Sequence, residues 1–282
     1  MTCALPAVPS RLSKSLMLAA IAATLSLLAP VAASAQSAWE NIRPEVFGQR
    51  IIHDGAGIMT LKAPFRPEDQ RAVPIGVDAK FADGRSVKAI TIIIDENPSP
   101  VATVLRPGAG RAHVGVNMNF RFNRKTNVRA IVEASDGELY MAHAFVRYAG
   151  GQSACSAPPN GNAEEIAASM GKMKLAELTD AAANANSTQI QRRARLELKH
   201  PNFTGLQMDQ ITLLYWPVHI IEKLEVRQGN DVVMQMENGI SVSEDPVIEF
   251  NFDLNGAGSL KVVASDTKKN VYEQTFPVGP GT

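Results

Sequence analysis

The positions of the apolar residues constrain the fold most, because over much of the chain they recur with a period of two. In the stretch 113–122, large apolar residues alternate with His, Gly, Asn or Arg. Successive side chains of a strand point to opposite faces, so this pattern predicts a strand with one buried and one wet face. Similar runs predict further strands at 58–63, 72–81, 87–94, 101–105, 127–134 and 139–148.

Turn-forming residues separate these runs. Asp83-Gly84 and Asp136-Gly137 are Asp-Gly pairs of the kind that favours tight hairpins, and segments rich in Pro and Gly stand at 97–100 and 106–110. The pattern contains no amphipathic helix between the runs. Short, regularly spaced strands of this kind predict an immunoglobulin-like antiparallel β-sandwich over 39–149.

A second set of strand signals follows at 195–198, 220–226, 232–236, 248–254, 260–264 and 271–276. These runs are again separated by turn residues, as at 228–230 and 255–258. They predict a second sandwich over 190–279, so we expect an all-β fold of two immunoglobulin-like domains.

The segment 150–189 between the two sets has a different composition, rich in Gly and Ala. Asn162 is expected to cap a short helix over 163–170, with Glu164 and Glu165 complementing the positive end of the helix dipole. The stretch after Met170 is compatible with either more helix or a strand, and 180–187 has the composition of a linker.

Residues 1–35 have the features of a secretory signal peptide. Arg11 and Lys14 precede an apolar run of about 13 residues, and small residues suitable for cleavage end at Ala35. We therefore expect a mature chain that starts at Gln36, is exported to the periplasm and has no membrane anchor. Export would also remove Cys3, one of the two cysteines, and leave Cys155 as a single thiol.

The charge balance excludes one class of partner. The whole chain has 28 basic and 28 acidic residues, and loss of the signal peptide lowers its net charge from zero to about −2. A protein that binds nucleic acid without sequence preference needs a basic surplus, so no nucleic-acid partner is expected.

Motifs for cofactors, metals and catalysis are missing. The sequence has no dinucleotide or phosphate-binding Gly motif and no zincin motif, and none of its five histidines (His53, His113, His143, His200 and His219) has helical ligand spacing. His53 and Asp54 form at most a weak candidate for a catalytic pair. We predict no cofactor, no metal and no autonomous enzymatic activity.

Cys155 is the best candidate for chemistry. Small residues surround it, so the segment lacks bulky side chains with which to bury its own thiol, and we expect the thiol to be exposed. Gly150 and Gly151 would give the preceding backbone the freedom that a carrier thiol needs. An inert buried thiol is the alternative.

The two halves resemble SoxY and SoxZ, subunits of the sulfur-oxidising Sox system. The stretches that carry the resemblance are 95–102, 110–114, 128–130 and 134–137 in the first half, and 200–201, 204–206 and 217–221 in the second. Their joint order is similar to that of the fused SoxYZ-like carriers associated with periplasmic quinoprotein dehydrogenases. The resemblance implies that Cys155 carries a sulfur-containing intermediate covalently, on an arm that includes Gly150 and Gly151.

One departure separates the chain from this pattern. Cys155 is followed by Ser-Ala-Pro-Pro instead of two glycines, and it lies between two domains and not at a free end. A tether fixed at both ends sweeps less volume, and prolines stiffen it.

Three functions stay open at this level. The first is a non-enzymatic sulfur carrier that works with Sox-type enzymes. The second is an accessory protein for a quinoprotein (PQQ-dependent) alcohol dehydrogenase and its cytochrome c, with Cys155 unused. The third is a homodimer linked through a Cys155 disulfide. The expected state is a monomer that acts as a fused pseudo-heterodimer.

Overall fold

The computed structural model describes residues 37–148, 153–178, 191–209 and 212–279. The signal-peptide prediction, Gly150, Gly151 and the predicted linker at 180–187 therefore lie outside the described residues. Ala38–Thr282 form one compact unit, and the description below concerns this unit alone.

Short strands are the main regular structure of the unit. The first half contains α2 (Ala38–Phe47), β1 (Ile52–Asp54), β2 (Met59–Lys62), β3 (Val73–Lys80), β4 (Val87–Ile94), β5 (Val101–Pro107), β6 (His113–Phe120), β7 (Thr126–Ala134) and β8 (Leu139–Val146). The middle segment contains α3 (Ala163–Ser169) and β9 (Met173–Leu178). The second half contains β10 (Gln191–Leu198), β11 (Ile221–Gln228), β12 (Asp231–Asn238), β13 (Val247–Asp253), β14 (Ser259–Asp266) and β15 (Val271–Pro277).

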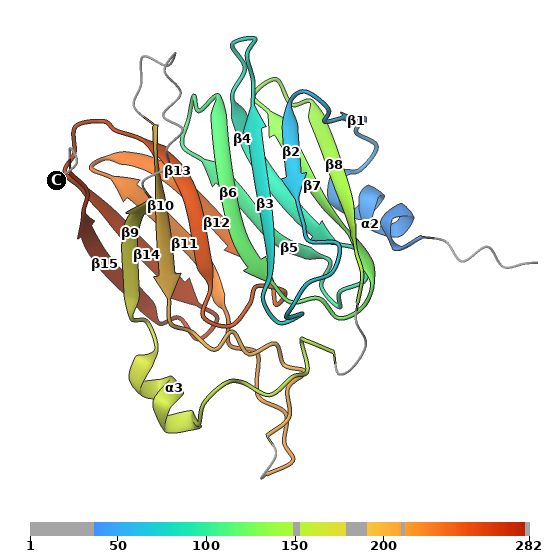
Figure 1. Cartoon of the computed structure of the whole chain (residues 1–282), viewed down its shortest axis with the longest axis vertical. Coiled ribbons are helices and arrows are strands. Elements are labelled where there is room, and N and C mark those ends of the chain that lie inside the picture. Colours follow the sequence, from blue (N-terminus) through green and yellow to red (C-terminus); the bar gives the residue numbers. More distant parts are fainter. Residues whose placement is uncertain (1–36, 149–152, 179–190, 210–211, 280–282) are drawn as a thin grey trace, which may run out of the picture. The chain divides into compact units, whose positions relative to one another are not determined.

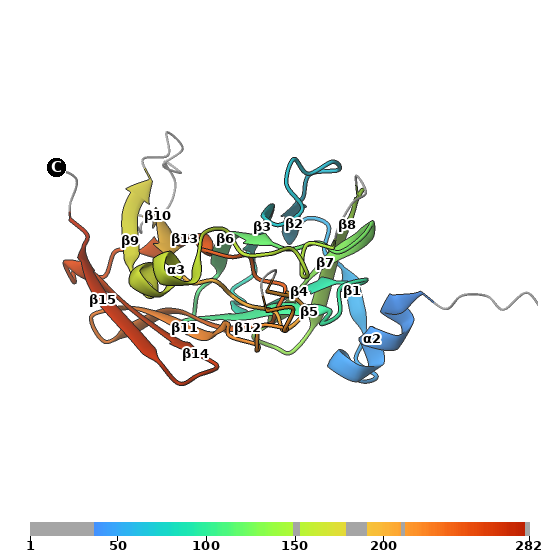
Figure 2. The same ribbon diagram turned by 90° about the horizontal axis from the view of Figure 1, so that it is seen from below.

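The strands form two sheets that pack face to face (Figure 1 and Figure 2). One sheet has the order β1-β8-β7-β4-β5-β12-β11-β14-β15, and the other has the order β2-β3-β6-β13-β10-β9. Apolar side chains from the inner faces of both sheets form one continuous buried cluster that includes residues of both halves. The all-β sandwich class predicted from the sequence is thus confirmed.

Both sheets continue from the first half of the chain into the second. In the larger sheet, β5 pairs antiparallel with β12 and places Leu105 opposite Met236. In the smaller sheet, β6 pairs antiparallel with β13 and places Met118 opposite Ile248. These four side chains are at most 2% exposed. Edge strands that would otherwise present unpaired backbone groups are therefore paired with each other.

The helix α2 is a feature that the period-two interpretation missed. Its Ile42 and Phe47 pack with Ile93, Ile131 and Leu139 in a second buried cluster. This packing explains why β4 is buried on both faces from Ala89 onward. A ten-residue helix with only two buried residues has too weak a pattern of apolar residues to be recognised from the sequence.

A buried ion pair fixes the region under α2. Arg129 makes bidentate hydrogen bonds to Asp95 at 2.8–3.0 Å, and its guanidinium lies 4.5 Å from the centroid of the Trp39 ring. The bidentate geometry satisfies both charges away from water, and the cation–π contact adds to it.

The predicted cap of α3 is confirmed. The Asn162 side chain accepts a hydrogen bond from the Glu165 backbone, and the Glu165 carboxylate accepts one from the Asn162 backbone. This reciprocal capping box satisfies two backbone donors that the helix start leaves unpaired. The chain then leaves the helix at Met170 and forms the edge strand β9, so the open choice after Met170 is decided in favour of a strand.

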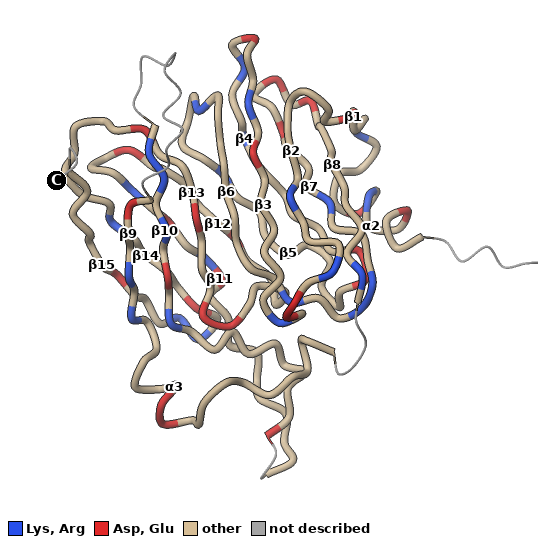
Figure 3. The backbone as a smooth tube through the Cα atoms, in the orientation of Figure 1, with Lys and Arg blue, Asp and Glu red and all other residues tan. Residues whose placement is uncertain are grey.

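Charged side chains of both signs are interspersed over the two halves (Figure 3). Several of them form ion pairs across neighbouring strands, such as Lys88 with Glu133 and Arg195 with Glu249. Among the residues that the structure describes, no helix is long and apolar enough to cross a membrane.

Candidate functional site

The thiol of Cys155 is buried. Cys155 lies on a turn between β8 and α3, closed by a hydrogen bond from the Ser156 backbone to the Ser153 carbonyl at 3.0 Å. It is free of any disulfide and 0% exposed. The expectation of an exposed thiol is therefore wrong, because small side chains around a cysteine allow distant segments to approach and cover it.

Polar side chains from both halves of the chain hold this turn. Asn123 accepts a hydrogen bond from the Cys155 backbone N–H at 2.9 Å, and the Thr204 hydroxyl donates to the Cys155 carbonyl. The Gln207 amide donates to the Ala157 carbonyl at 3.0 Å, and Glu244 accepts from the Asn160 backbone at 3.0 Å. We call this set of contacts the clamp. Figure 1 shows the chain before α3 running alongside the loop that precedes β11.

A buried arginine supports the loop that supplies Thr204 and Gln207. Arg121 is 2% exposed and donates hydrogen bonds to the carbonyls of Pro201, Asn202 and Val242 at 2.7–3.2 Å. Its partners are all backbone carbonyls, and no carboxylate of the described residues forms an ion pair with it. The Arg121 guanidinium thus places a positive charge under the clamp, and the carboxylate whose charge acts on it is that of Glu244.

The environment keeps the Cys155 thiol protonated. Burial raises its pKa to about 11, and the nearby charge of Arg121 and the hydrogen bond with Asn123 oppose this shift only in part. The thiolate is the nucleophilic form of cysteine, so a thiol with this pKa is unreactive near neutral pH. Chemistry at Cys155 therefore requires the clamp to open.

A small cavity of about 60 Å³ lies beside the turn. Its walls include Arg71, Arg121, Ala154, Gln207 and Glu244. The pKa of Glu244 is raised, because the effect of burial outweighs the lowering effect of the hydrogen bond from the Asn160 backbone. Cys155 does not line this cavity, so the cavity offers the thiol no room for a bound group in the closed arrangement.

The structure places His143 on the surface and divides the other four histidines between two surface pairs and one buried group. His53 Nε2 lies 2.7 Å from Glu138 Oε2, while the Asp54 carboxylate accepts a hydrogen bond from the Ala56 backbone N–H. The candidate catalytic pair of His53 and Asp54 therefore does not form. His113 lies 2.9 Å from Asp78. His200 and His219, by contrast, meet at Asp266 in the interior.

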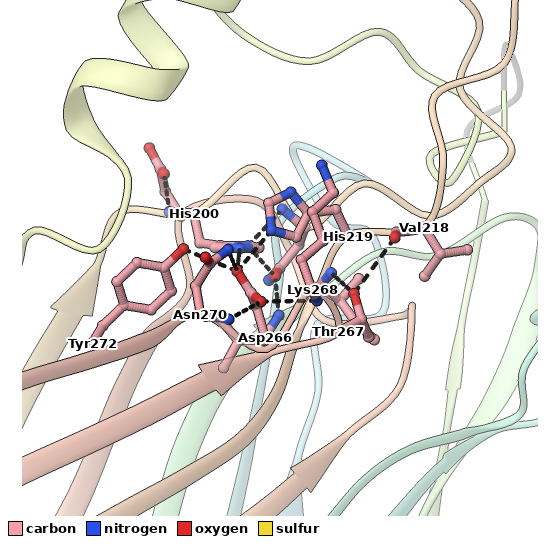
Figure 4. Close-up of polar contacts among 12 residues, drawn as sticks. His200, Val218, His219, Asp266, Thr267, Lys268, Asn270 and Tyr272 are labelled. Atoms are coloured by element: carbon pink, nitrogen blue, oxygen red, sulfur yellow. Dashed lines mark hydrogen bonds and ion pairs between the residues drawn. The ribbon is translucent and has the colours of Figure 1, made fainter.

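Asp266 is the centre of this buried group (Figure 4). Its Oδ2 atom accepts hydrogen bonds from His219 at 2.7 Å, Asn270 at 2.8 Å and Tyr272 at 2.9 Å. Its Oδ1 atom accepts from the backbone N–H groups of Lys268 and Asn270, each at 2.9 Å. Burial raises the pKa of Asp266, but these donors outweigh that effect and hold the pKa below its usual range.

Sequence reasoning missed the clamp residues and Asp266. The clamp residues lie far from Cys155 in sequence, with Asn123 at a separation of 32 residues and Thr204 at 49. Only the resemblance of 200–201 and 204–206 to SoxZ pointed to this loop. Nothing in the sequence connects Asp266 to His200 or His219. The pairing of β11 with β14 brings His219 to Asp266, and the bridge between Phe203 and His219 holds the loop of His200 beside them.

Comparison with protein families gives two adjacent matches. The family model described as sulfur oxidation protein SoxY matches residues 43–153, and the model described as sulphur oxidation protein SoxZ matches residues 181–277. Comparison with curated proteins gave no match.

Solved structures give weaker similarities. The sulfur carrier protein SoxY from Chlorobium limicola f thiosulfatophilum is 25% identical, with 38% of this chain and 93% of that chain covered and a TM-score of 0.33. A beta-glycosidase from Bacteroides vulgatus is 10% identical, with 78% and 24% covered and a TM-score of 0.21. These scores are too low to carry an argument, so the two sequence matches decide the family.

Proposed function

Because the chain is a SoxY domain fused to a SoxZ domain, we propose that it is a non-enzymatic periplasmic carrier that holds a sulfur-containing group covalently on Cys155. Residues 1–35, which have the features of a signal peptide, support the periplasmic location. Proteins of the Sox type are the expected partners, and they would perform the redox steps.

The position of Cys155 carries this proposal. Cys155 is the only cysteine among the described residues, and it lies two residues beyond the end of the SoxY match, on a turn between the two domains. The clamp holds the turn mainly through hydrogen bonds to its backbone, and each such bond contributes only about 1 kcal/mol. Opening the turn therefore costs less free energy than separating a strand from its sheet, and the opening exposes the thiol.

Loading by persulfide transfer needs no external oxidant. The Cys155 thiolate attacks the outer sulfur of a partner's persulfide, a new S–S bond forms on Cys155, and the partner's inner sulfur leaves as a thiolate. The proton lost by Cys155 on ionisation balances the charge on the departing thiolate, and no net oxidation occurs. Because the clamped thiol is protonated, the partner must open the clamp before this step.

Intact-mass spectrometry of protein purified from the periplasm tests the proposal. We expect a reducible mass increase on Cys155 during growth on reduced sulfur compounds, and its absence from a Cys155→Ser variant. A uniformly free thiol under these conditions would overturn the carrier role.

The burial of Cys155 favours a second candidate function. In this alternative, the protein is an accessory of a quinoprotein alcohol dehydrogenase, and Cys155 is a structural residue. The Cys155→Ser variant distinguishes the two functions, because full dehydrogenase activity together with unchanged sulfur-dependent growth in cells that carry it supports the accessory role. Loss of sulfur-dependent growth with intact dehydrogenase activity supports the carrier.

A further inference from the structure

The buried group at Asp266 brings together three side chains that can bind a metal ion. His200 follows β10, His219 precedes β11, and Asp266 is the last residue of β14. One ligand atom from each residue lies within 4.8 Å of the others. The side chains of His200, His219 and Asp266 are 0%, 4% and 0% exposed.

His200 has a ring nitrogen that makes no hydrogen bond with any of the described residues. Its Nδ1 atom lies 2.8 Å from the Asn202 side-chain oxygen and 3.1 Å from the Asn202 backbone nitrogen. Its Nε2 atom is buried without a hydrogen-bond partner and lies 3.7 Å from Asp266 Oδ2, beyond hydrogen-bond distance. Buried polar atoms are nearly always satisfied, so this nitrogen needs an explanation.

The imidazole rings are held in place by their neighbours. The rings of His200 and His219 meet edge to face with centroids 4.7 Å apart, and His219 Nε2 is 2.7 Å from Asp266 Oδ2. The Asn202 side-chain oxygen lies 2.8 Å from His200 Nδ1, and a hydrogen bond at this second nitrogen orients the ring of a metal-binding histidine. Figure 4 shows both rings and the carboxylate converging.

We propose that His200, His219 and Asp266 bind a divalent transition-metal ion, with Zn²⁺ the best match. Two imidazole nitrogens and one carboxylate oxygen suit Zn²⁺, whereas Ca²⁺ and Mg²⁺ prefer oxygen ligands alone. The ion gives the His200 Nε2 lone pair a partner.

Metal binding also changes the position of a proton. A neutral imidazole that binds an ion through Nε2 carries its proton on Nδ1, so coordination by His219 replaces the contact of its Nε2 atom with Asp266 and releases no net proton. Asn270 and the backbone donors of Oδ1 remain to orient the carboxylate.

The proposed metal site does not require that Cys155 carries a sulfur-containing group. Its connection to the rest of the molecule passes through Asn202, whose side chain contacts His200 and whose carbonyl accepts a hydrogen bond from Arg121. Thr204 of the clamp follows two residues later. A bound ion would therefore hold the base of the loop that covers Cys155.

Titration of the metal-free mature protein with Co²⁺, as a spectroscopic substitute for Zn²⁺, tests the site. The titration is done in a Cys155→Ser background, so that no thiolate can bind the ion. We expect visible ligand-field absorption that saturates at one equivalent and disappears when Zn²⁺ is added. Absence of this absorption from correctly folded protein would overturn the proposal.

Two matched variants locate the ion. His200→Phe keeps a ring in the same space but removes the nitrogen that binds the ion. Loss of a group that only orients a metal ligand weakens binding about 10–100-fold, so we expect loss of the ligand itself to weaken Co²⁺ binding at least as much. His113→Phe removes a histidine that also pairs with a carboxylate, Asp78, at the surface, and binding should not change. Equal binding by His200→Phe, with its fold checked by circular dichroism, would place the ion elsewhere and refute the assignment.

Discussion

The two halves of this protein meet in two ways, and the two contacts differ in kind. At the sheet junction, β5 pairs with β12 and β6 with β13, over side chains that are almost fully buried. At the clamp, single polar side chains hold the backbone of the Cys155 turn. Burial of apolar surface contributes most of the stability of a fold, whereas one hydrogen bond contributes little. The turn can therefore open while the two halves stay joined.

The largest effect is expected at the sheet junction. Leu105→Ala removes a side chain that is 2% exposed and lies opposite Ile90 of β4 and Met236 of β12. We expect the free energy of unfolding, measured by urea titration, to fall by about 2–5 kcal/mol. The matched control Leu214→Ala, at a side chain that is 69% exposed, should change it by no more than about 0.5 kcal/mol. Equal losses in both variants would mean that the junction is not a packed core.

An intermediate effect is expected from pH at the clamp. The Cys155 pKa is raised from 9.0 to about 11 in the folded protein, so the thiol ionises first in the unfolded chain. Its burial stabilises the fold fully below pH 9, and this contribution is lost as pH rises toward 11. Relative to Cys155→Ser, the wild-type protein should lose about 1–3 kcal/mol between pH 9 and pH 11. Parallel stability curves for the two proteins would show that the thiol is not buried in solution.

The smallest effect is expected when one clamp bond is removed. Thr204→Val keeps the shape of the side chain but removes the hydroxyl, which donates to the Cys155 carbonyl and accepts from the Leu206 backbone N–H. A loss of about 1 kcal/mol should raise the population of the open turn, and with it the rate of Cys155 alkylation by iodoacetamide, about fivefold. Thr60→Val, at an exposed threonine of β2, is the matched control and should leave the rate unchanged. An unchanged rate in Thr204→Val would exclude a gating role for this bond.

The sequence predicted those features that depend on local pattern. Alternation placed most of the strands, with β4 at its observed bounds of Val87–Ile94, but it missed β1 and the start of β10; the spacing from Asn162 to Glu165 predicted the start of α3. Such patterns reflect the pleat of a strand and the unpaired donors of a helix start, so they can be recognised without tertiary contacts. The helix α2 was missed because only Ile42 and Phe47 among its residues are buried.

The candidate site was predicted only in part. The sequence selected Cys155 as the residue of interest, but its exposure was predicted wrongly because the covering residues come from other parts of the chain. The pairing of the strands into sheets brings Asn123 and Thr204 to the turn and places Arg121 beneath them. Long-range pairing of this kind leaves no periodic signal in a single sequence.

The continuous sheets have a consequence for the order in which the chain is made. The first half is synthesised before β12 and β13 exist, so β5 and β6 present unpaired backbone groups until the second half arrives. Such edges are templates for pairing with other chains. The nascent protein therefore passes through a stage at which aggregation competes with folding, and a chain that ends after β9 would remain in it.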